Sequence, residues 1–514
     1  MMKRIVLIVI LFLVIACEAE VNEQVKLDTV GSGEAQDVIT FRVSVPHNSA
    51  AEDIIYFERY QPEGIVSTRM KKIGMYEHEI VFSLDELEYQ YNDFGKTSIK
   101  YRYTRNNAGY LTSEFYPPDS FEHLGSILER ESFVEPGVTI KDTIERWRWF
   151  PPDTGKIERT SALDPLAIFD PRLNNTKFRS GQALQDLYLP EFDEFFDSTA
   201  KHMKKQGYTW VYISPPWDWK IDTPKPKLLE NDEGHPNYPE GKLAEHIIAF
   251  KKQGLKVYLA PQICCSSLDM ELKDAEWWES YYQEIKRFLV YHAGIASSED
   301  VDTFLFDIFD LQEAGFEDYE DRVWDLLAAV KKEYPGQIAA HVWNFFPGDD
   351  STNQATVIPE PDYFFWSDDI DVFTYQMDVP LSLLDNPSDV ELLQTAGRQI
   401  DGAKVLYETF DKPIILLTTY PSLETAWKGS NIFDIQVMNY PWVPERDVKH
   451  TFSGSDQARV VHALFGAIAD RPWVIGFFNF GYWHWDMPLV PDMSVRGKPA
   501  EDVWRKWNQN VISS

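Results

Sequence analysis

The stretch Thr209-Trp210-Val211-Tyr212-Ile213-Ser214 is apolar almost throughout and predicts a buried strand. The helical pattern before it ends at Gly207. A second unit of the same kind follows, with a predicted helix around residues 243–250, a stop at Gly254 and a strand at residues 256–261. Apolar strands that alternate with amphipathic helices are typical of a parallel sheet covered by helices.

The same alternation continues toward the C-terminus. Further strands are predicted at residues 303–307, 337–343, 371–375, 413–418 and 473–478, with helices at 277–292, 319–332 and 455–470. A candidate first strand, Leu166–Phe169, brings the number of strands to eight. Eight strands favour a TIM (β/α)8 barrel over an open sheet.

The chain before this barrel has a different pattern. Short alternating runs at residues 38–45, 53–57, 76–82 and 99–104 predict strands of a β-sandwich that covers residues 36–147. All 17 tryptophans lie at or after Trp147, so we place the domain boundary near residues 145–152 and assign the tryptophans to the barrel half. The predicted fold class is an all-β sandwich followed by an α/β TIM barrel at residues 148–514.

Charge and composition exclude some classes of function. The chain has 49 Lys and Arg against 82 Asp and Glu, a formal charge of −33, which argues against a nucleic-acid partner. A hydrophobic content of 44% excludes a disordered chain. No metal or cofactor motif is present, so we expect neither. The oligomeric state is left open.

The N-terminus predicts export. Lys3 and Arg4 precede an apolar run from Ile5 to Ile15, which is too short to span a bilayer and is typical of a signal peptide. Val14-Ile15-Ala16-Cys17 resembles the lipobox of bacterial lipoproteins, which implies acylation of Cys17 after removal of residues 1–16, followed by a linker at residues 17–35. The alternative is an ordinary secretory signal. We expect a protein anchored by lipid to a membrane of the bacterial cell envelope.

The working side chains of a TIM barrel lie just past the C-terminal ends of its strands. Several aromatic and amide residues fall there, and their rings and polar groups suit a sugar, which needs both stacking faces and hydrogen-bond partners. We predict a barrel-top carbohydrate cleft lined by Trp217, Trp219, Trp343, Asn344, Tyr375, Tyr420, Trp483 and Trp485. Three carboxylates share this position: Asp307, Asp310 and Asp378.

The order of segments in the first domain resembles family 20 starch-binding modules. The resemblance rests on residues 53–57, 98–105 and 137–144. Such modules stack sugar rings on tryptophan, which is absent here before Trp147. Tyrosines would have to substitute, and the candidates are Tyr56, Tyr60, Tyr76, Tyr101 and Tyr103. Glycan binding and a role as a structural spacer both remain open for this domain.

The second domain resembles clan A glycoside hydrolases, and within them the family 113 β-mannanases. The resemblance rests on residues 207–211, 252–261, 277–282, 366–375, 457–477 and 496–501, in that order. It implies a glutamate acid/base after the fourth strand and a glutamate nucleophile at the end of the seventh. Here the fourth strand ends in Asp307, and Thr418 stands at the expected nucleophile position. A threonine hydroxyl is not ionised near neutral pH and cannot replace that carboxylate.

Two hypotheses therefore remain. In the first, the chain is a glycoside hydrolase acting on an oligo- or polysaccharide, with Asp307 or Asp310 as nucleophile and Asp378 as acid/base. In the second, the barrel is a non-catalytic glycan-binding lipoprotein. The first domain's resemblance favours an α-glucan and the second's favours a β-mannan, so the glycan is left open.

Overall fold

A computed structural model describes residues 38–61, 64–87, 90–91, 97–106, 113–114, 130–148, 150, 178–184, 190–220, 223–229, 241–264, 268, 270, 273–308, 311–343, 364–429 and 452–511. The predicted signal peptide, the lipidation site at Cys17 and the linker lie outside these residues, and they stay predictions. Within the described part of the chain, no helix has the length and apolar character needed to cross a membrane.

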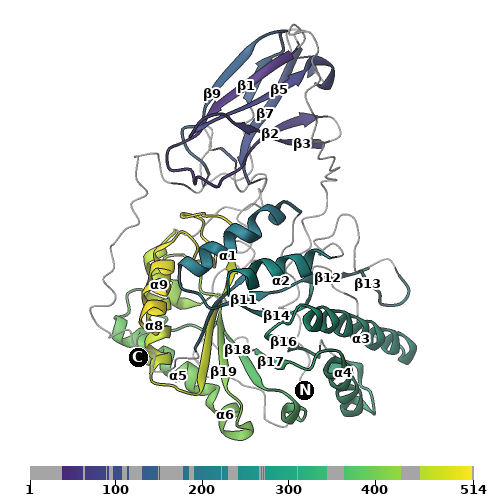
Figure 1. Ribbon diagram of the computed structural model, residues 1–514. Helices are drawn as coiled ribbons and strands as arrows, with labels where there is room; N and C mark the ends of the chain where they lie inside the picture. The colour runs from purple at the N-terminus through teal and green to yellow at the C-terminus, as the bar shows by residue number, and fades with distance from the viewer. Residues whose placement is uncertain are drawn as a thin grey trace.

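Two sheets form the N-terminal sandwich, as predicted (Figure 1). One contains, in spatial order, β4 (Lys71–Lys72), β5 (Glu77–Ser83), β1 (Val38–Ser44) and β9 (Thr139–Thr143). The other contains β3 (Gly64–Arg69), β2 (Ile55–Gln61), β7 (Thr97–Arg105) and β6 (Gln90–Tyr91), and β8 (Arg130–Phe133) also pairs with β7. Alternate residues turn inward, so the Phe57 ring contacts those of Phe41 at 4.5 Å and Tyr101 at 4.9 Å.

Trp147 belongs to the core of the sandwich. Its side chain is fully buried in the same cluster as Phe41 and Phe57, and its indole N–H donates to Ser49 Oγ at 2.7 Å. Phe150 packs in the same cluster. The assignment of every tryptophan to the barrel half is therefore wrong for Trp147, because the chain leaving the sandwich folds back to close its core.

The second domain is a closed barrel of parallel strands, as predicted. In order around the barrel these are β10 (Arg179–Leu184), β11 (Trp210–Ile213), β14 (Lys256–Leu259), β16 (Thr303–Phe306), β17 (Gln337–Trp343), β18 (Val372–Met377), β19 (Ile414–Thr418) and β20 (Val474–Tyr482). The expected first strand, Leu166–Phe169, lies outside the described residues. The strand that pairs with both β11 and β20 and closes the barrel is β10.

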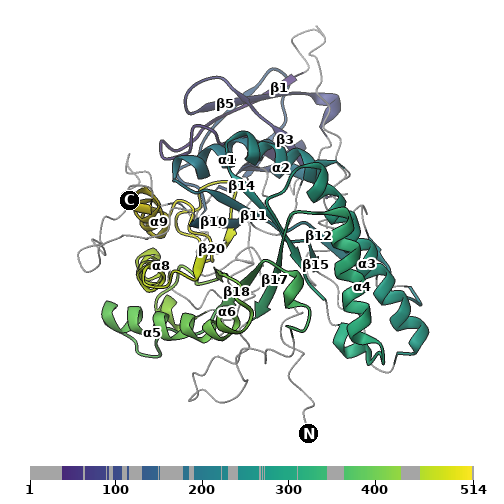
Figure 2. The ribbon, with the colours of Figure 1, turned by 60° about the horizontal axis from the view of Figure 1, so that its bottom comes forward.

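Helices surround the barrel (Figure 2). They are α1 (Phe196–Lys205), α2 (Lys242–Lys252), α3 (Ala275–Ser298), α4 (Tyr319–Glu333), α5 (Asp389–Gly402), α6 (Lys404–Phe410), α8 (Gly454–Ala469) and α9 (Pro499–Val511). Helices α5, α6 and α9 were not predicted. The start of α5 is fixed by a capping box, in which Ser388 Oγ accepts from the Glu391 N–H and Glu391 accepts from the Ser388 N–H.

Short elements complete the described structure. A small sheet has the order β13 (Leu228–Leu229), β12 (Pro216–Trp219), β15 (Gln262–Cys264) and continues outward from β11 and β14. The 3-10 helices are η1 (Leu84–Glu86), η4 (Pro190–Phe195), η5 (Leu311–Ala314), η7 (Ser367–Asp369) and η8 (Ala426–Lys428).

Aromatic rings fill the barrel interior. Tyr212 and Tyr258 stack at 4.7 Å, and Phe478 contacts them at 6.0 and 5.9 Å. The Tyr258 hydroxyl shares a 2.7 Å hydrogen bond with Thr374 Oγ1 on the far wall. Every second residue of a strand points into this interior, and the residues between them pack against the helices.

The sandwich contacts the barrel beside α1 (Figure 1). Arg69 pairs with Glu194 of η4 at 2.9 Å. Arg105 is fully buried, pairs with Asp53 at 2.9 Å and donates to the Asp486 carbonyl oxygen at 3.3 Å. Glu194 and Asp486 follow the C-terminal ends of β10 and β20, so the sandwich rests on two connections that leave the rim where a TIM barrel carries its site.

A buried ion pair fixes the connection after β20. The Lys498 ammonium donates to Asp492 Oδ1 and to Ser422 Oγ, the latter at 2.9 Å, and Trp483 Nε1 donates to Asp492 Oδ2 at 2.6 Å. Burial lowers the pKa of Lys498 and raises that of Asp492, and the attraction within the pair opposes both shifts. Ser422 follows β19, so the pair ties together the last two connections at the barrel rim.

We predict that Trp147→Ala will destabilise the protein strongly, because it removes a fully buried ring from the sandwich core. The expected loss is about 3–5 kcal/mol in the free energy of unfolding, measured by urea denaturation. Met75→Ala is the control, since that side chain is 74% exposed and should cost no more than about 0.5 kcal/mol. Equal losses in the two variants would contradict the assignment of Trp147 to the core.

We also predict that Lys498→Met will cost about 3–5 kcal/mol in the same measurement, because Asp492 is then a buried carboxylate without its cation. The double variant Lys498→Met/Asp492→Leu should lose less, since it leaves no buried charge behind. Lys225→Met, which breaks an exposed pair with Glu276, should change stability by about 0–1 kcal/mol. A Lys498 variant as stable as the Lys225 variant would refute this account.

Candidate active site

The rim residues that face the barrel interior follow from the alternation along each strand. Leu305 and Leu417 lie inside the barrel, so Asp307 and Thr419, two residues further on, share that inward position. On β18, Thr374 faces inward and is followed on the same side by Gln376 and Asp378. The fourth, sixth and seventh barrel strands thus direct polar side chains toward one mouth.

Asp378 is held on both carboxylate oxygens. Thr419 Oγ1 donates to Oδ1 at 2.5 Å, and Gln376 Nε2 donates to Oδ2 at 2.8 Å. Burial raises the pKa of the Asp378 carboxyl above its usual value, although both donors oppose that rise by stabilising the ionised form. A carboxyl group with a raised pKa can carry a proton at a pH where an exposed aspartate cannot.

His341 extends this group onto β17. Gln376 hydrogen-bonds to the His341 ring, and burial lowers the pKa of this histidine to about 4. At neutral pH His341 is therefore uncharged and adds no cation beside Asp378. His341 lies in β17, the fifth barrel strand, two residues after Ala339 of the interior cluster, so it shares the inward position.

Asp307 follows β16 directly and is half-buried. Its Oδ1 accepts the Ile308 N–H at 2.7 Å. Burial, with the nearby Asp307 charge as a smaller cause, raises the pKa of Tyr319 to about 12. Asp307 and Asp378 come from strands separated only by β17, so two carboxyl groups face the same mouth.

Three other predicted residues cannot be placed with side chains. Asp310 and Asn344 lie outside the described residues, and only the backbone of Trp343, the last residue of β17, is described. Of the two aspartates predicted as alternative nucleophiles, the structure therefore describes Asp307 alone.

Trp217 and Trp219 do not present open faces, contrary to our prediction. Their side chains are 2% and 4% exposed. The Trp217 ring packs against Phe288 at 5.2 Å, and Trp219 stacks on Tyr281 at 5.0 Å. Both partners lie on α3, so these tryptophans join β12 to that helix as core residues.

Trp483 and Trp485 are also core residues, against the same prediction. They are 4% and 3% exposed. Trp483 donates to Asp492, and the Trp485 ring contacts Phe192 and Phe195 at 5.3 and 5.4 Å. They fasten the connection after β20 to η4.

Tyr375 and Tyr420 lie behind the barrel wall. Both are buried in the cluster between strands and helices, and neither belongs to the interior cluster. The Tyr420 hydroxyl donates to the Val379 carbonyl oxygen at 2.6 Å. Their predicted role in lining the cleft is wrong for this structure, because on β18 and beyond β19 they fall on the outward side of the alternation.

At the end of the seventh strand, the residue that faces the barrel interior comes one position after the expected Thr418. Thr418 is 1% exposed and follows Leu416 on the outward side, while Thr419 faces the interior. The inward position at this strand end therefore belongs to Thr419. Gln376 and Thr419 were not among the residues predicted for the site. Both lie an even number of residues after an interior residue of their strand, and this alternation is the signal that identifies them.

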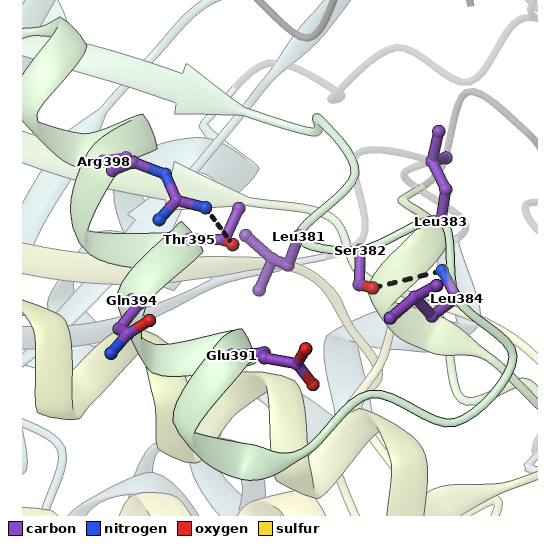
Figure 3. A pocket seen from close by; sticks show the side chains of 8 residues that line it. All are labelled: Leu381, Ser382, Leu383, Leu384, Glu391, Gln394, Thr395 and Arg398. Atoms are coloured by element: carbon purple, nitrogen blue, oxygen red, sulfur yellow. Dashed lines mark hydrogen bonds between the residues drawn. The ribbon is translucent and has the colours of Figure 1, made fainter. Parts of the chain in front are cut away.

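A pocket of about 280 Å³ lies on the outer side of this rim (Figure 3). Leu381 to Leu384 of the β18–α5 connection form one side, and α5 contributes Glu391, Gln394, Thr395 and Arg398. Arg398 donates to Thr395 Oγ1 at 2.7 Å. None of the predicted site residues lines it. In the described residues, no group of three His, Cys, Asp or Glu side chains is arranged to hold a metal ion.

The tyrosines proposed for glycan stacking in the sandwich are partly inaccessible. Tyr101 and Tyr103 are 2% and 0% exposed, and both hydroxyls donate to Asp142 Oδ2, at 2.9 and 2.7 Å. Tyr56, Tyr60 and Tyr76 are half-buried. Of the five candidates, only these last three have exposed surface on which a sugar ring can stack. The resemblance to a starch-binding module stays a prediction.

Comparison with known proteins identifies the barrel domain. The model of Glycoside Hydrolase Family 113 matches residues 193–499. A solved GH113 β-1,4-mannanase is 19% identical with a TM-score of 0.49, covering 65% of this chain and 98% of its own. GH113 β-mannanase AaManA from Alicyclobacillus acidocaldarius is 17% identical with a TM-score of 0.48, covering 65% and 97%.

An endo-1,4-β-D-mannanase from Thermotoga petrophila RKU-1 is 12% identical with a TM-score of 0.39, covering 66% of this chain and 99% of its own. A search of the curated proteins finds no match. The family model extends over more than half of the chain, and we conclude that the chain belongs to Glycoside Hydrolase Family 113.

Proposed function

We propose that this protein hydrolyses a β-linked oligo- or polysaccharide of the mannan type, with Asp378 as the acid and Asp307 as the second carboxylate. The observation that carries the proposal is Asp378, an inward-facing rim carboxyl whose pKa is raised by burial. It stands in the barrel of a glycoside hydrolase family, with Asp307 directed at the same mouth.

Asp378 has the properties of a general acid. Cleavage of a glycosidic bond needs a proton on the departing oxygen, and a carboxyl group kept protonated by burial can donate it. The proton passes from Asp378 to that oxygen as the bond from the anomeric carbon breaks, which leaves Asp378 as a carboxylate. Thr419 and Gln376 then stabilise this ionised form through hydrogen bonds already in place.

Asp307 supplies the second group. As a nucleophile its carboxylate attacks the anomeric carbon and water later releases the sugar; as a base it takes the proton from the attacking water. The first course retains and the second inverts the configuration, and they need carboxyl separations of about 5–5.5 Å and 6.5–9.5 Å respectively. The anomer formed first in the product distinguishes the two courses.

Family membership favours a β-mannan over a starch-type α-glucan. The match to Glycoside Hydrolase Family 113 covers the barrel that carries both carboxyls, and the matched structures in that family are named as β-1,4-mannanases. The starch-type resemblance concerns the sandwich alone, where two of the five candidate tyrosines are buried in the core.

A non-catalytic glycan-binding protein is the second candidate. The observation in its favour is strand β19, which ends at Thr418: no residue from Ile414 to Tyr420 carries a carboxyl group. Hydrolysis then depends wholly on carboxylates from other strands. Binding of mannan without release of reducing ends by the wild-type protein would select this candidate.

We predict that substitution of Asp378 and substitution of Asp307 will have different effects on two substrates. Asp378→Asn should lower hydrolysis of β-1,4-mannan about 10²–10⁴-fold, the usual contribution of a general acid. The same variant should keep most of its activity on a dinitrophenyl β-mannoside, whose leaving group departs without a proton. Asp307→Asn should lose activity on both. Reducing-end release and dinitrophenolate absorbance measure the two reactions.

Matched controls lie at the opposite ends of the same strands. Asp302 and Asp371 precede β16 and β18, and each accepts a backbone N–H from the neighbouring strand, from Val257 at 2.9 Å and Ile338 at 2.8 Å. Asp302→Asn and Asp371→Asn should retain wild-type activity because an amide oxygen accepts the same bond. Full activity in Asp307→Asn or Asp378→Asn would remove that residue from the mechanism.

We predict a pH dependence with a definite sign. Asp378 must be protonated to act, and its folded-state pKa is raised, so kcat/KM should fall as pH rises through that raised value. The fall should be present with mannan and much weaker with the dinitrophenyl mannoside. Activity on mannan that stays constant from pH 4 to pH 8 is the result that would exclude Asp378 as the acid.

A further inference from the structure

The end of β19 holds the carboxyl group of Asp378 in place. We propose that Thr419 is the positioning residue of this site, and that its hydroxyl donates to Asp378 Oδ1 so that the carboxyl points into the barrel mouth. The seventh barrel strand then contributes a hydrogen-bond donor in place of a carboxylate. The inference rests on the proposed function, because it assigns a task within the same site.

The side-chain contacts leave the carboxyl group one orientation. Thr419 binds Oδ1 from β19 at 2.5 Å, while Gln376 binds Oδ2 from β18 itself at 2.8 Å. Rotation of the carboxyl plane would break both bonds at once. Thr419 is only 7% exposed, so water has little access to replace its hydroxyl. A donor bound to an ionised oxygen is also stronger than one bound to a neutral group.

The backbone around Asp378 is held by the same segment. An added Cβ at Gly429 would lie 2.5 Å from the Asp378 carbonyl oxygen, so this residue packs directly on it at a φ of +81°. Tyr420 donates to the Val379 carbonyl at 2.6 Å, and the Leu381 N–H donates to the Trp427 carbonyl at 2.7 Å. Contacts from 419 to 429 therefore fix both the main chain and the side chain of the carboxyl.

The titratable groups around Asp378 come from four elements. Asp307 lies past β16, and His341 on β17 is linked through Gln376. Tyr375 lies on β18 and Tyr420 beyond β19, where burial and then the Asp378 charge raise the pKa of Tyr420. Lys428 is paired with Asp385 at 2.7 Å in the adjoining connections. The side chains of Thr419 and Gln376 donate to Asp378 and stabilise its ionised form.

The first test is the pH profile of Thr419 variants on β-1,4-mannan. Thr419→Val keeps the shape of the side chain and removes the donor, so the ionised form of Asp378 is less stable. The upper limb of kcat/KM should move to higher pH by about one unit, the effect of one hydrogen bond to a charged oxygen. Thr419→Ser keeps the hydroxyl and should return the limb to its wild-type position. Should the valine variant not fold, Thr419→Ala should give the same shift.

The second test needs no activity and therefore separates this inference from the proposed function. Folded Asp378 has a raised pKa, so its burial costs stability only above the unfolded value, and Thr419→Val should extend that loss to higher pH. The difference in thermal midpoint between wild type and Thr419→Val should thus be small near pH 3.5 and grow as pH rises. In an Asp378→Asn background the difference should not depend on pH.

Each result of these tests either supports or overturns the inference. A growing difference that vanishes in the Asp378→Asn background supports the inference even if no glycan is hydrolysed, in which case only the proposed function fails. A difference independent of pH in both backgrounds, or an unshifted limb in Thr419→Val, would overturn it. An equal shift in Thr419→Ser would also overturn it, because the serine keeps the donor.

Discussion

Closure of eight parallel strands around three aromatic rings is the constraint on which the rest of the structure depends. Tyr212, Tyr258 and Phe478 fill the interior, and the hydrogen bond between the Tyr258 and Thr374 hydroxyl groups fixes which side of β18 faces inward. Every side chain further along the strands follows in steps of two, and a shift of one residue would reverse the whole set. Asp378 therefore faces the mouth because Thr374, four residues earlier on β18, is held inward by the packing of the barrel interior.

Strands that are apolar along their length could be predicted, and β17 has the predicted bounds, residues 337–343. Strand β10 could not, because it reads Arg-Ser-Gly-Gln-Ala-Leu. Its small residues are the complement of a large neighbour: an added Cβ at Gly181 would lie 2.2 Å from the Phe478 ring. A search for apolar runs passes over such a strand, since the hydrophobic surface that buries it belongs to β20.

The inward-facing aspartates Asp307 and Asp378 were predictable from their place after strands, whereas the burial of the aromatic residues was not. Trp217 and Trp219 alternate with other residues as in an exposed loop, yet β12 extends the wall outward and α3 covers it. The sequence contains no local signal for that cover, because α3 begins 56 positions after Trp219 (275 − 219). Thr418 and Thr419 show a second limit of prediction from sequence. They are identical neighbours, and only the alternation of side chains along a strand of the closed barrel decides that Thr419 faces inward and Thr418 outward.

One buried residue, Arg105, contacts both the sandwich core and the barrel. Arg105 carries its charge into the sandwich core, stacks over Phe150 at 4.2 Å and still reaches the Asp486 carbonyl of the barrel. Trp147 and Phe150 lie on the chain that leaves the sandwich, so a domain cut at the end of the last strand, β9, would lack both of these core residues. The structural domain of the sandwich therefore extends to residue 150, past the end of its last strand.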